Sequence, residues 1–309
     1  MITEKVSIDQ IMRKAYRHRI LIPSFNVAYL PMIKPIVDTL KKTYTFGLVE
    51  VARPDVEKFG AKSFREVANR YYALADRQFS RLHLDHIPVI DEDGEKVDWE
   101  YLIRMGLELG YDSVMIDGSR LNLEENIAIT KRVVDISHQQ GVPVEAELGA
   151  VLGHEEGPLP SYEELFQTKK GFTSPEQAER FVKETGVDWL SVAIGNIHGA
   201  ISGIAKNKRK VSARLNLDHL RELTRVTKIP LVLHGGSGVK KASLIEAVQN
   251  GITKINVGTS IRQIYEQSLS KKPDDVETAQ MRVAAEIERL IKEEYEIAGS
   301  WNHLTKWIK

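Results

Sequence analysis

Three histidines have positions that would let them bind one metal ion. His86 and His234 each follow a short apolar segment, and His198 follows another by a few residues. Three imidazoles that leave a fourth position open form a known catalytic zinc arrangement. The chain contains no cysteine, so histidine, aspartate or glutamate must hold any transition metal. An ordinary core or loop histidine is the alternative for each residue alone, but the shared placement predicts a zinc site.

Carboxylates near these histidines could transfer protons. Asp85 directly precedes His86, and Glu155 lies in a loop long enough to fold over a neighbouring site. Both are candidates for general acid or base catalysis, although an exposed acidic loop is the alternative for Glu155. Asp117 and Glu147 also lie at the ends of apolar segments, where they could bind the metal or support its ligands.

Two loops that contain glycine indicate a phosphate site. The sequence HGGSG begins at His234 and the sequence NVGTS begins at Asn256, each at the end of an apolar segment. Glycine lets backbone N–H groups approach an anion closely, and small hydroxyl groups add further donors. A flexible turn would also account for HGGSG, but the adjacent histidine favours phosphate binding.

The elements that must position these residues follow a regular pattern. Short apolar or β-branched segments predict eight strands at residues 21–27, 46–52, 81–85, 112–117, 142–148, 188–194, 229–234 and 252–257. Amphipathic segments predict helices between them at residues 32–42, 64–75, 99–109, 124–139, 175–185, 218–227 and 241–251. An acidic insertion at residues 87–98 and a long loop at residues 149–172 lie outside the pattern. His219 and three further histidines in predicted helices or tails are expected at the surface.

Eight strands that alternate with helices predict an α/β fold, and eight is the number that closes a TIM (β/α)8 barrel. A doubly wound sheet is the alternative, but such sheets usually carry a glycine-rich loop after the first strand. Here the first strand ends in SFNVAYL, which has no glycine. In a barrel the carboxyl ends of all strands share one face, so the three histidines would converge there with Asn26. We predict one domain, with the barrel at about 20–270 and a helical extension at about 271–309, in which residues 276–297 form one helix.

Composition and charge limit the class of protein. The 309 residues include 43 basic and 43 acidic side chains, which gives a formal net charge of zero, and 42% of the residues are hydrophobic. A balanced charge argues against nucleic acid as a partner, and the hydrophobic content suffices for a folded core. The first twenty residues lack the apolar segment of a secretory signal, and no apolar run approaches the roughly 18 residues that span a membrane. We therefore expect a cytoplasmic protein that contacts neither nucleic acid nor membrane.

Several motifs resemble the zinc-dependent class II fructose-bisphosphate aldolase family. In chain order they are HLDH (83–86), SVMIDGS (113–119), EENIAITKRVV (124–134), VEAELG (144–149), VAIGNIHG (192–199), PLVLHGGSG (230–238) and KINVGT (254–259). The resemblance extends from about residue 20 to 270, which is the whole predicted barrel. It implies a lyase that cleaves a phosphorylated ketose, such as fructose 1,6-bisphosphate, to dihydroxyacetone phosphate and an aldehyde. Zinc would stabilise the enediolate that this cleavage leaves.

The resemblance also implies roles for particular residues. His86, His198 and His234 would hold zinc, with Asp117 and Glu147 at alternative or supporting metal positions. Asp85 would be the acid/base at the hydroxyl that becomes the aldehyde, and Glu155 would move the proton on the dihydroxyacetone phosphate carbon. Expected substrate and phosphate contacts are Asn26, Gly199, Gly235, Ser237, Asn256, Thr259 and Arg262. The family further implies a monovalent cation, Na+ or K+, near the phosphate. It also implies a homodimer or homotetramer, in which Arg262 reaches the distal phosphate of a neighbouring subunit.

Departures from the family pattern are concentrated near the substrate. They are Ala52, Ile87, Arg120, His154, Ser202 and Gly258. Tagatose 1,6-bisphosphate, a ketose 1-phosphate or a sulfonated sugar phosphate are therefore alternative substrates. A zinc hydrolase and a non-catalytic sugar-phosphate-binding protein are the other classes of function. Asp85, Glu155 and the HGGSG loop favour the aldolase.

Overall fold

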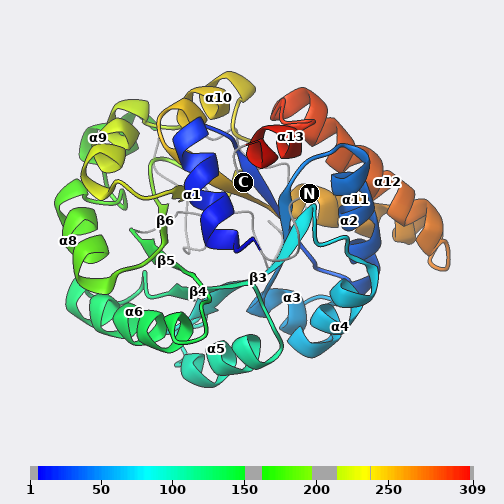
Figure 1. Ribbon diagram of the computed structural model, residues 1–309, viewed down its shortest axis with the longest axis horizontal. Coiled ribbons are helices and arrows are strands. Elements are labelled where there is room, and N and C mark those ends of the chain that lie inside the picture. The colour runs from blue at the N-terminus through cyan, green and yellow to red at the C-terminus, as the bar shows by residue number, and fades with distance from the viewer. Residues whose placement is uncertain (1–5, 150–161, 197–213, 237, 307–309) are drawn as a thin grey trace.

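A closed barrel of eight parallel strands forms the centre of the molecule (Figure 1). The computed structural model describes residues 6–149, 162–196, 214–236 and 238–306. Each strand pairs with the next along the chain, and the eighth pairs with the first. The strands are β1 Ile22–Asn26, β2 Gly47–Ala52, β3 Ser80–Pro88, β4 Ser113–Asp117, β5 Val144–Leu148, β6 Trp189–Val192, β7 Leu231–Leu233 and β8 Ile252–Val257. The predicted TIM barrel is confirmed.

An outer ring of helices covers the barrel (Figure 1). It contains α2 Ile33–Lys42, α4 Phe64–Leu74, α5 Trp99–Glu108, α6 Leu123–His138, α8 Pro175–Thr185, α9 Leu217–Thr227, α10 Lys241–Gln249 and α11 Thr259–Lys271. The strands are buried on both faces, which explains why they appear in the sequence as continuous apolar runs. Capping residues set the helix ends. For example, the Ser174 side chain accepts the Gln177 N–H at the start of α8, and Gly186 ends that helix with a φ of 71°.

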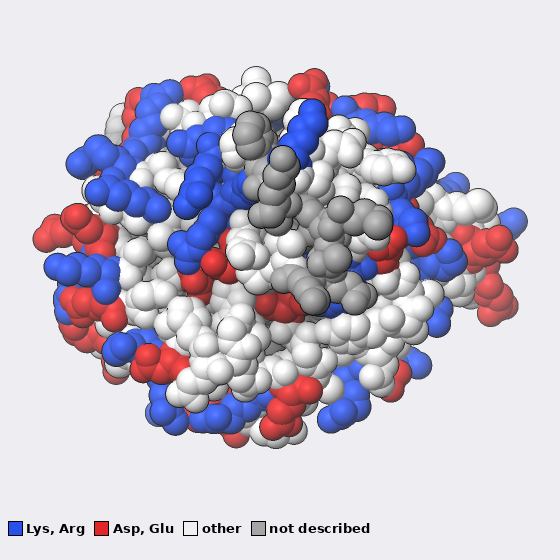
Figure 2. Space-filling model, in the orientation of Figure 1, with Lys and Arg blue, Asp and Glu red and all other residues white. Residues whose placement is uncertain are grey.

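Helix α1, Ile8–His18, covers the amino-terminal end of the barrel, and the sequence analysis did not predict it. Arg81, near the start of β3, donates from Nη2 to the Val6 carbonyl at 2.9 Å. Arg13 of α1 lies 3.2 Å from Asp188, the residue before β6. In Figure 1 this helix lies in front of the strands, and Figure 2 shows that basic and acidic side chains both surround this face. The opposite, carboxyl-terminal end of the barrel is therefore where a site can form.

The segments outside the barrel repeat differ from the predictions. The predicted helix at 276–297 ends three residues early: α12 Val276–Arg289 continues directly into a π-helical turn, Leu290–Glu294, and the prediction is wrong only beyond Glu294. A short helix, α7 Tyr162–Thr168, lies within the predicted long loop. Further short elements are η1 Leu30–Met32, α3 Arg53–Glu57 and α13 Ser300–Thr305. In α13, the Trp301 ring stacks on Phe46 at 5.9 Å, which packs the helical extension against the barrel. None of the helices in the described ranges is long and apolar enough to cross a bilayer.

Candidate active site

An irregularity in β3 brings two adjacent polar residues to one place. Leu84 pairs with Val114 and Ile87 pairs with Ile116, so Asp85 and His86 together stand opposite a single residue of β4. This is a β-bulge, and His86 has a φ of 36°, in the left-handed region that residues other than glycine rarely adopt. The prediction that β3 ends at residue 85 is therefore wrong. The strand continues beyond the bulge into what was taken as the insertion.

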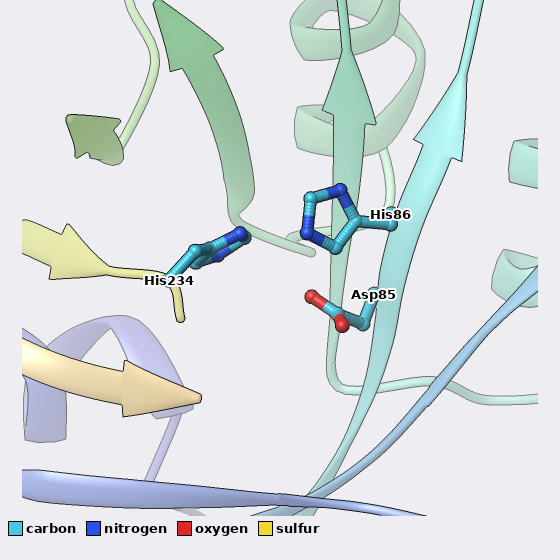
Figure 3. A group of neighbouring side chains, drawn as sticks. All are labelled: Asp85, His86 and His234. Carbon is cyan, nitrogen blue, oxygen red and sulfur yellow. The ribbon is translucent and has the colours of Figure 1, made fainter. Parts of the chain in front are cut away.

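The bulge directs Asp85 and His86 toward His234, which directly follows β7 (Figure 3). The ring centroids of the two histidines are 4.4 Å apart. Asp85, His86 and His234 each offer a ligand atom within 4.8 Å of the others, and so do His86, Asp117 and Glu147. Five predicted site residues thus lie together at the carboxyl end of the barrel. His198 and Glu155 lie outside the described residues.

A buried carboxylate determines which nitrogen of His234 faces the cluster. His234 Nε2 lies 2.8 Å from Glu145 Oε1, and Lys254 Nζ lies 2.9 Å from the other carboxylate oxygen. Burial opposes ionisation of Glu145, but Lys254 and His234 hold its pKa well below the ordinary value. An ionised carboxylate can only accept, so Nε2 of His234 carries the donated hydrogen. Nδ1 is left facing Glu147, whose Oε2 is 3.3 Å away.

The cluster suits a divalent cation. Burial alone would lower the pKa of His86, but Asp85, Asp117 and Glu147 raise it to about 10. Burial and His86 likewise oppose protonation of His234, whereas Glu145 and Glu147 raise its pKa to about 9. The surroundings therefore stabilise positive charge strongly. The buried Oε2 of Glu147 makes no hydrogen bond within the described residues. Imidazole nitrogens and carboxylate oxygens are ligands that Zn2+ accepts, so the donor set fits this ion.

Two amide groups hold the carboxylate of Asp85. Asn26 donates from Nδ2 to Oδ2 at 3.1 Å, and Asn256 donates from Nδ2 to Oδ1 at 3.0 Å. Burial would raise the pKa of Asp85, but the charges of His86 and Lys254 lower it. Asp85 is therefore an ionised, oriented proton acceptor beside the candidate metal ligands. Asn26 and Asn256, predicted as substrate contacts, act on Asp85 in this structure.

The loops after β7 and β8 have the features of an anion site. Gly235 has a φ of 67°, and a Cβ on Gly236 would lie 2.3 Å from a methyl carbon of Ile255, so neither position accepts a side chain readily. Thr259 is the first residue of α11, and the positive end of this helix dipole favours an anion. The buried hydroxyl of Ser260 has no hydrogen-bond partner among the residues described. Ser260 is the last residue of the NVGTS sequence and was not among the predicted substrate contacts. Gly199 and Ser237 lie outside the described residues.

Arg262, the predicted ligand of a distal phosphate, is held within its own chain. Its side chain lies 2.7 Å from Glu266 Oε2, and its guanidinium carbon lies 4.6 Å from the centre of the Phe59 ring. Only 5% of the residue is exposed. These two contacts hold the guanidinium close to the barrel rim.

A buried cluster of ionisable side chains, which contains Lys254, lies beneath the site and was not predicted. Lys254 lies between Glu50 at 3.3 Å and Glu145 at 2.9 Å, and all three are fully buried. A lysine within an apolar strand needs a buried carboxylate as its partner. The position of Lys254 in the sequence KINV could therefore have indicated this cluster. The surface placement expected of His219 is wrong, because this residue is 4% exposed and its Nε2 lies 2.8 Å from the Thr173 carbonyl oxygen.

Comparison with known proteins agrees with this geometry. A family model described as fructose-bisphosphate aldolase class-II matches residues 6–303. A 6-phospho-5-dehydro-2-deoxy-D-gluconate aldolase from Bacillus licheniformis is 31% identical over 258 residues, which cover 82% of this chain and 79% of the relative. The crystal structure of the YdjI aldolase from Escherichia coli is 26% identical, with a TM-score of 0.74, and the match covers 95% of this chain and 99% of that chain. A fructose-bisphosphate aldolase from Campylobacter jejuni shares the fold at 19% identity, with a TM-score of 0.73 over 95% of this chain and 96% of that one. The chain is thus a lyase and belongs to the class II fructose-bisphosphate aldolase family.

Proposed function

We propose that this enzyme reversibly cleaves a phosphorylated ketose to dihydroxyacetone phosphate and an aldehyde, with a divalent metal ion as cofactor. The observation that carries the proposal is the ionised Asp85, held by two amides beside His86 and His234. A base at this position can accept the proton of a sugar hydroxyl group. The membership of the family and the anion-binding features after β7 and β8 support a phosphorylated substrate.

The side chains would divide the reaction between them. Zn2+ held by His86, His198 and His234, with Asp117 and Glu147 in supporting positions, would supply a Lewis acid that stabilises negative charge on the ketone half. Asp85 accepts the hydroxyl proton, the oxygen forms the aldehyde carbonyl, and the carbon–carbon bond breaks with its electron pair left on the ketone half. Glu155, which would enter the step protonated, then donates its proton to that carbon and completes dihydroxyacetone phosphate, and exchange with water restores both carboxyl groups. The resemblance supports this role for Glu155.

The phosphate of the ketone half would bind at the loops after β7 and β8. Backbone N–H groups near Gly235 and at the start of α11, including Thr259, would donate to it. Gly199 and Ser237 would complete this site, with Na+ or K+ beside it, as the resemblance implies. We propose a homodimer or homotetramer as the working form and the cytoplasm as its location.

The aldehyde half distinguishes the candidate substrates. Gly258 stands where fructose-specific members often have aspartate, and a Cβ at this position would lie 3.0 Å from Asn26 Oδ1. An aspartate would press on Asn26, and this chain has no carboxylate at the position, which supports an aldehyde half different from that of fructose 1,6-bisphosphate. The relative from Bacillus licheniformis is named for a phosphorylated sugar acid, so this class belongs among the candidates.

A substrate panel tests the proposal. Cleavage would be assayed with fructose 1,6-bisphosphate, tagatose 1,6-bisphosphate, fructose 1-phosphate, a sulfonated ketose phosphate and 6-phospho-5-dehydro-2-deoxygluconate, before and after chelation. We expect release of dihydroxyacetone phosphate from at least one, loss of activity with chelator and recovery with Zn2+. Asp85→Ala should lower kcat by about 100-fold or more. Full activity after complete metal removal would reject the metal assignment, and normal turnover of Asp85→Ala would reject its role as base.

A further inference from the structure

A pocket lies outside the barrel, near its amino-terminal end and away from the candidate active site. Its walls come from the junction between α1 and β1, from α10, and from the chain between the π-helical turn and α13 (Figure 1). Its volume of about 260 Å³ is below the roughly 300–1,000 Å³ of pockets that bind drug-sized ligands. Only a small molecule would therefore fit.

Apolar side chains form part of the pocket wall. Those that are buried include Leu21 before β1, Leu244 and Val248 of α10, and Tyr295 and Ile297 before α13. An apolar group that entered the pocket would displace water from this surface, which is favourable. The pocket therefore suits a ligand with an apolar body.

Arg19, at the end of α1, brings to the pocket a positive charge that no carboxylate neutralises. Its side chain makes no hydrogen bond or ion pair within the described residues, and its Nη1 is buried. The guanidinium carbon lies 5.1 Å from the centre of the Tyr16 ring. Glu296, the carboxylate that lines the pocket, is paired instead with Lys241 Nζ at 2.5 Å. The guanidinium is therefore available to an anion.

The backbone at Arg19 is unusual for an arginine. This residue caps the end of α1 with a φ of 55°, and its N–H donates to the carbonyl oxygens of Ala15 and Tyr16. Glycine is the usual residue at such a left-handed position, because a Cβ is strained there. The end of the helix therefore does not explain why the chain has an arginine at this place.

Ser300 supplies a second unused hydrogen-bonding group. It is the first residue of α13 and is only 4% exposed, and its buried Oγ has no partner among the residues described. Buried hydroxyl groups are usually bonded, because an unsatisfied one is unfavourable. Since no hydrogen bond holds the side chain of Ser300 or Arg19, each can turn toward a ligand without breaking one. The same pocket thus combines a cation, a hydroxyl group and apolar surface.

We propose that this pocket binds a small organic anion. Its carboxylate accepts hydrogen bonds from Arg19 and Ser300, and its apolar body packs against Leu244 and Val248 of α10. Guanidinium and carboxylate are matched in charge and in geometry. The alternative is a gap in the packing that holds only water. The site is independent of the proposed aldolase reaction, so either can fail without the other.

Binding of simple carboxylates tests the proposal. The probes are benzoate, cyclohexanecarboxylate and 3-methylbutanoate, measured by ligand-observed NMR on chelator-treated protein so that no active-site metal ion binds them. We expect at least one to bind with a Kd of about 0.1–1 mM. Benzyl alcohol has the apolar body of benzoate without its charge and should bind about 10-fold more weakly. No binding by any of the three acids up to about 10 mM would overturn the proposal.

Two arginines of the same helix provide a matched pair of variants. Arg19→Gln should weaken binding of the best acid about 10-fold or more, as for a lost hydrogen bond to a charged group. Arg17→Gln should leave it unchanged, because Arg17 is exposed and lies outside the pocket. Equal affinities for the two variants would exclude Arg19 as the ligand's partner. Binding that is lost in His86→Ala would place the anion at the candidate active site instead.

Ser300→Ala tests the hydroxyl group without removing any existing hydrogen bond. We expect the Tm of the ligand-free protein to stay the same and the affinity for the best acid to fall about 5-fold. A lower Tm with unchanged affinity would show that Ser300 serves the fold and does not contact a ligand.

Discussion

One buried cation, Lys254, stabilises the ionised form of one neighbouring carboxyl group more than that of the other. The two groups are Glu145 and Glu50. Lys254 lies nearer to Glu145, at 2.9 Å, than to Glu50, at 3.3 Å. Trp189 Nε1 also donates to Glu145 at 2.7 Å, so this carboxylate is well stabilised in its ionised form. Burial and the nearby Asp85 raise the pKa of Glu50 to about 8. At neutral pH, Glu50 therefore keeps its proton, while Glu145 is ionised and accepts from His234.

The proton on Glu50 predicts a pH dependence of stability. The folded protein raises its pKa from 4.5 to about 8, so the folded state binds this proton more tightly than the unfolded chain. The resulting stabilisation is complete below about pH 4.5 and is lost as the pH rises through about 8. We therefore expect the free energy of unfolding to fall more between pH 5 and pH 8 in the wild-type protein than in the Glu50→Gln variant. Urea denaturation of the two chelator-treated proteins measures this difference. The exposed Glu108→Gln variant should follow the wild type, and parallel curves for all three would contradict the assignment.

Arg262 predicts a difference between classes of substrate. Its charge is held close to the rim by Glu266 and Phe59, where it could pair with an anion at the distal end of the sugar. Arg262→Ala should lower kcat/KM for bisphosphates about 10- to 100-fold, as for loss of a charged hydrogen bond, and affect ketose 1-phosphates less. Steady-state kinetics on both classes measures this difference. Equal losses would remove Arg262 from the distal site.

At the scale of elements, the sequence pattern predicts the barrel but not its irregularities. The eight apolar runs mark the strands because both faces of each strand are buried, and polar residues at their ends mark the site. The β3 bulge carries no such signal. Asp85 and His86 interrupt the apolar run, so the pattern predicts that the strand ends there, although Ile87 and Pro88 pair with β4 beyond them. The contacts of Asn26 and Asn256 with Asp85 were equally hidden, because they depend on how β1, β3 and β8 lie in the closed barrel.

The junction between β4 and α6 offers a test of how an element supports the site. A Cβ on Gly118 would lie 2.2 Å from Asn126 Oδ1, and Asn126 donates from Nδ2 to the Glu147 carbonyl at 3.0 Å. Gly118→Ala should therefore displace Asn126 and loosen the end of β5 that carries Glu147. We expect a loss of about 1–3 kcal/mol in unfolding free energy and weaker Zn2+ binding by equilibrium dialysis.

Gly141→Ala is the control for this junction. Gly141 has a φ of 69° with open space around its Cβ position, so the substitution adds about 1–2 kcal/mol of backbone strain without a collision. Its Zn2+ affinity should equal that of the wild type. Equal affinities for the Gly118→Ala and Gly141→Ala variants would show that Asn126 does not support the metal site.

At the scale of the whole molecule, the site exists only when the barrel is closed. Its residues come from β1, β3, β4, β5, β8 and the end of β7, so an unfolded chain does not hold them together. Metal binding should therefore stabilise the fold. At a free Zn2+ concentration about 1,000 times the Kd, binding should raise the free energy of unfolding by about 4 kcal/mol. Calorimetry should then show a Tm several degrees above that of the chelated protein.

His86→Ala should lose most of this rise in Tm. His138→Ala should keep it, because His138 pairs with Asp188 at the opposite end of the barrel. A rise of the same size in His86→Ala would place the stabilising metal elsewhere in the chain.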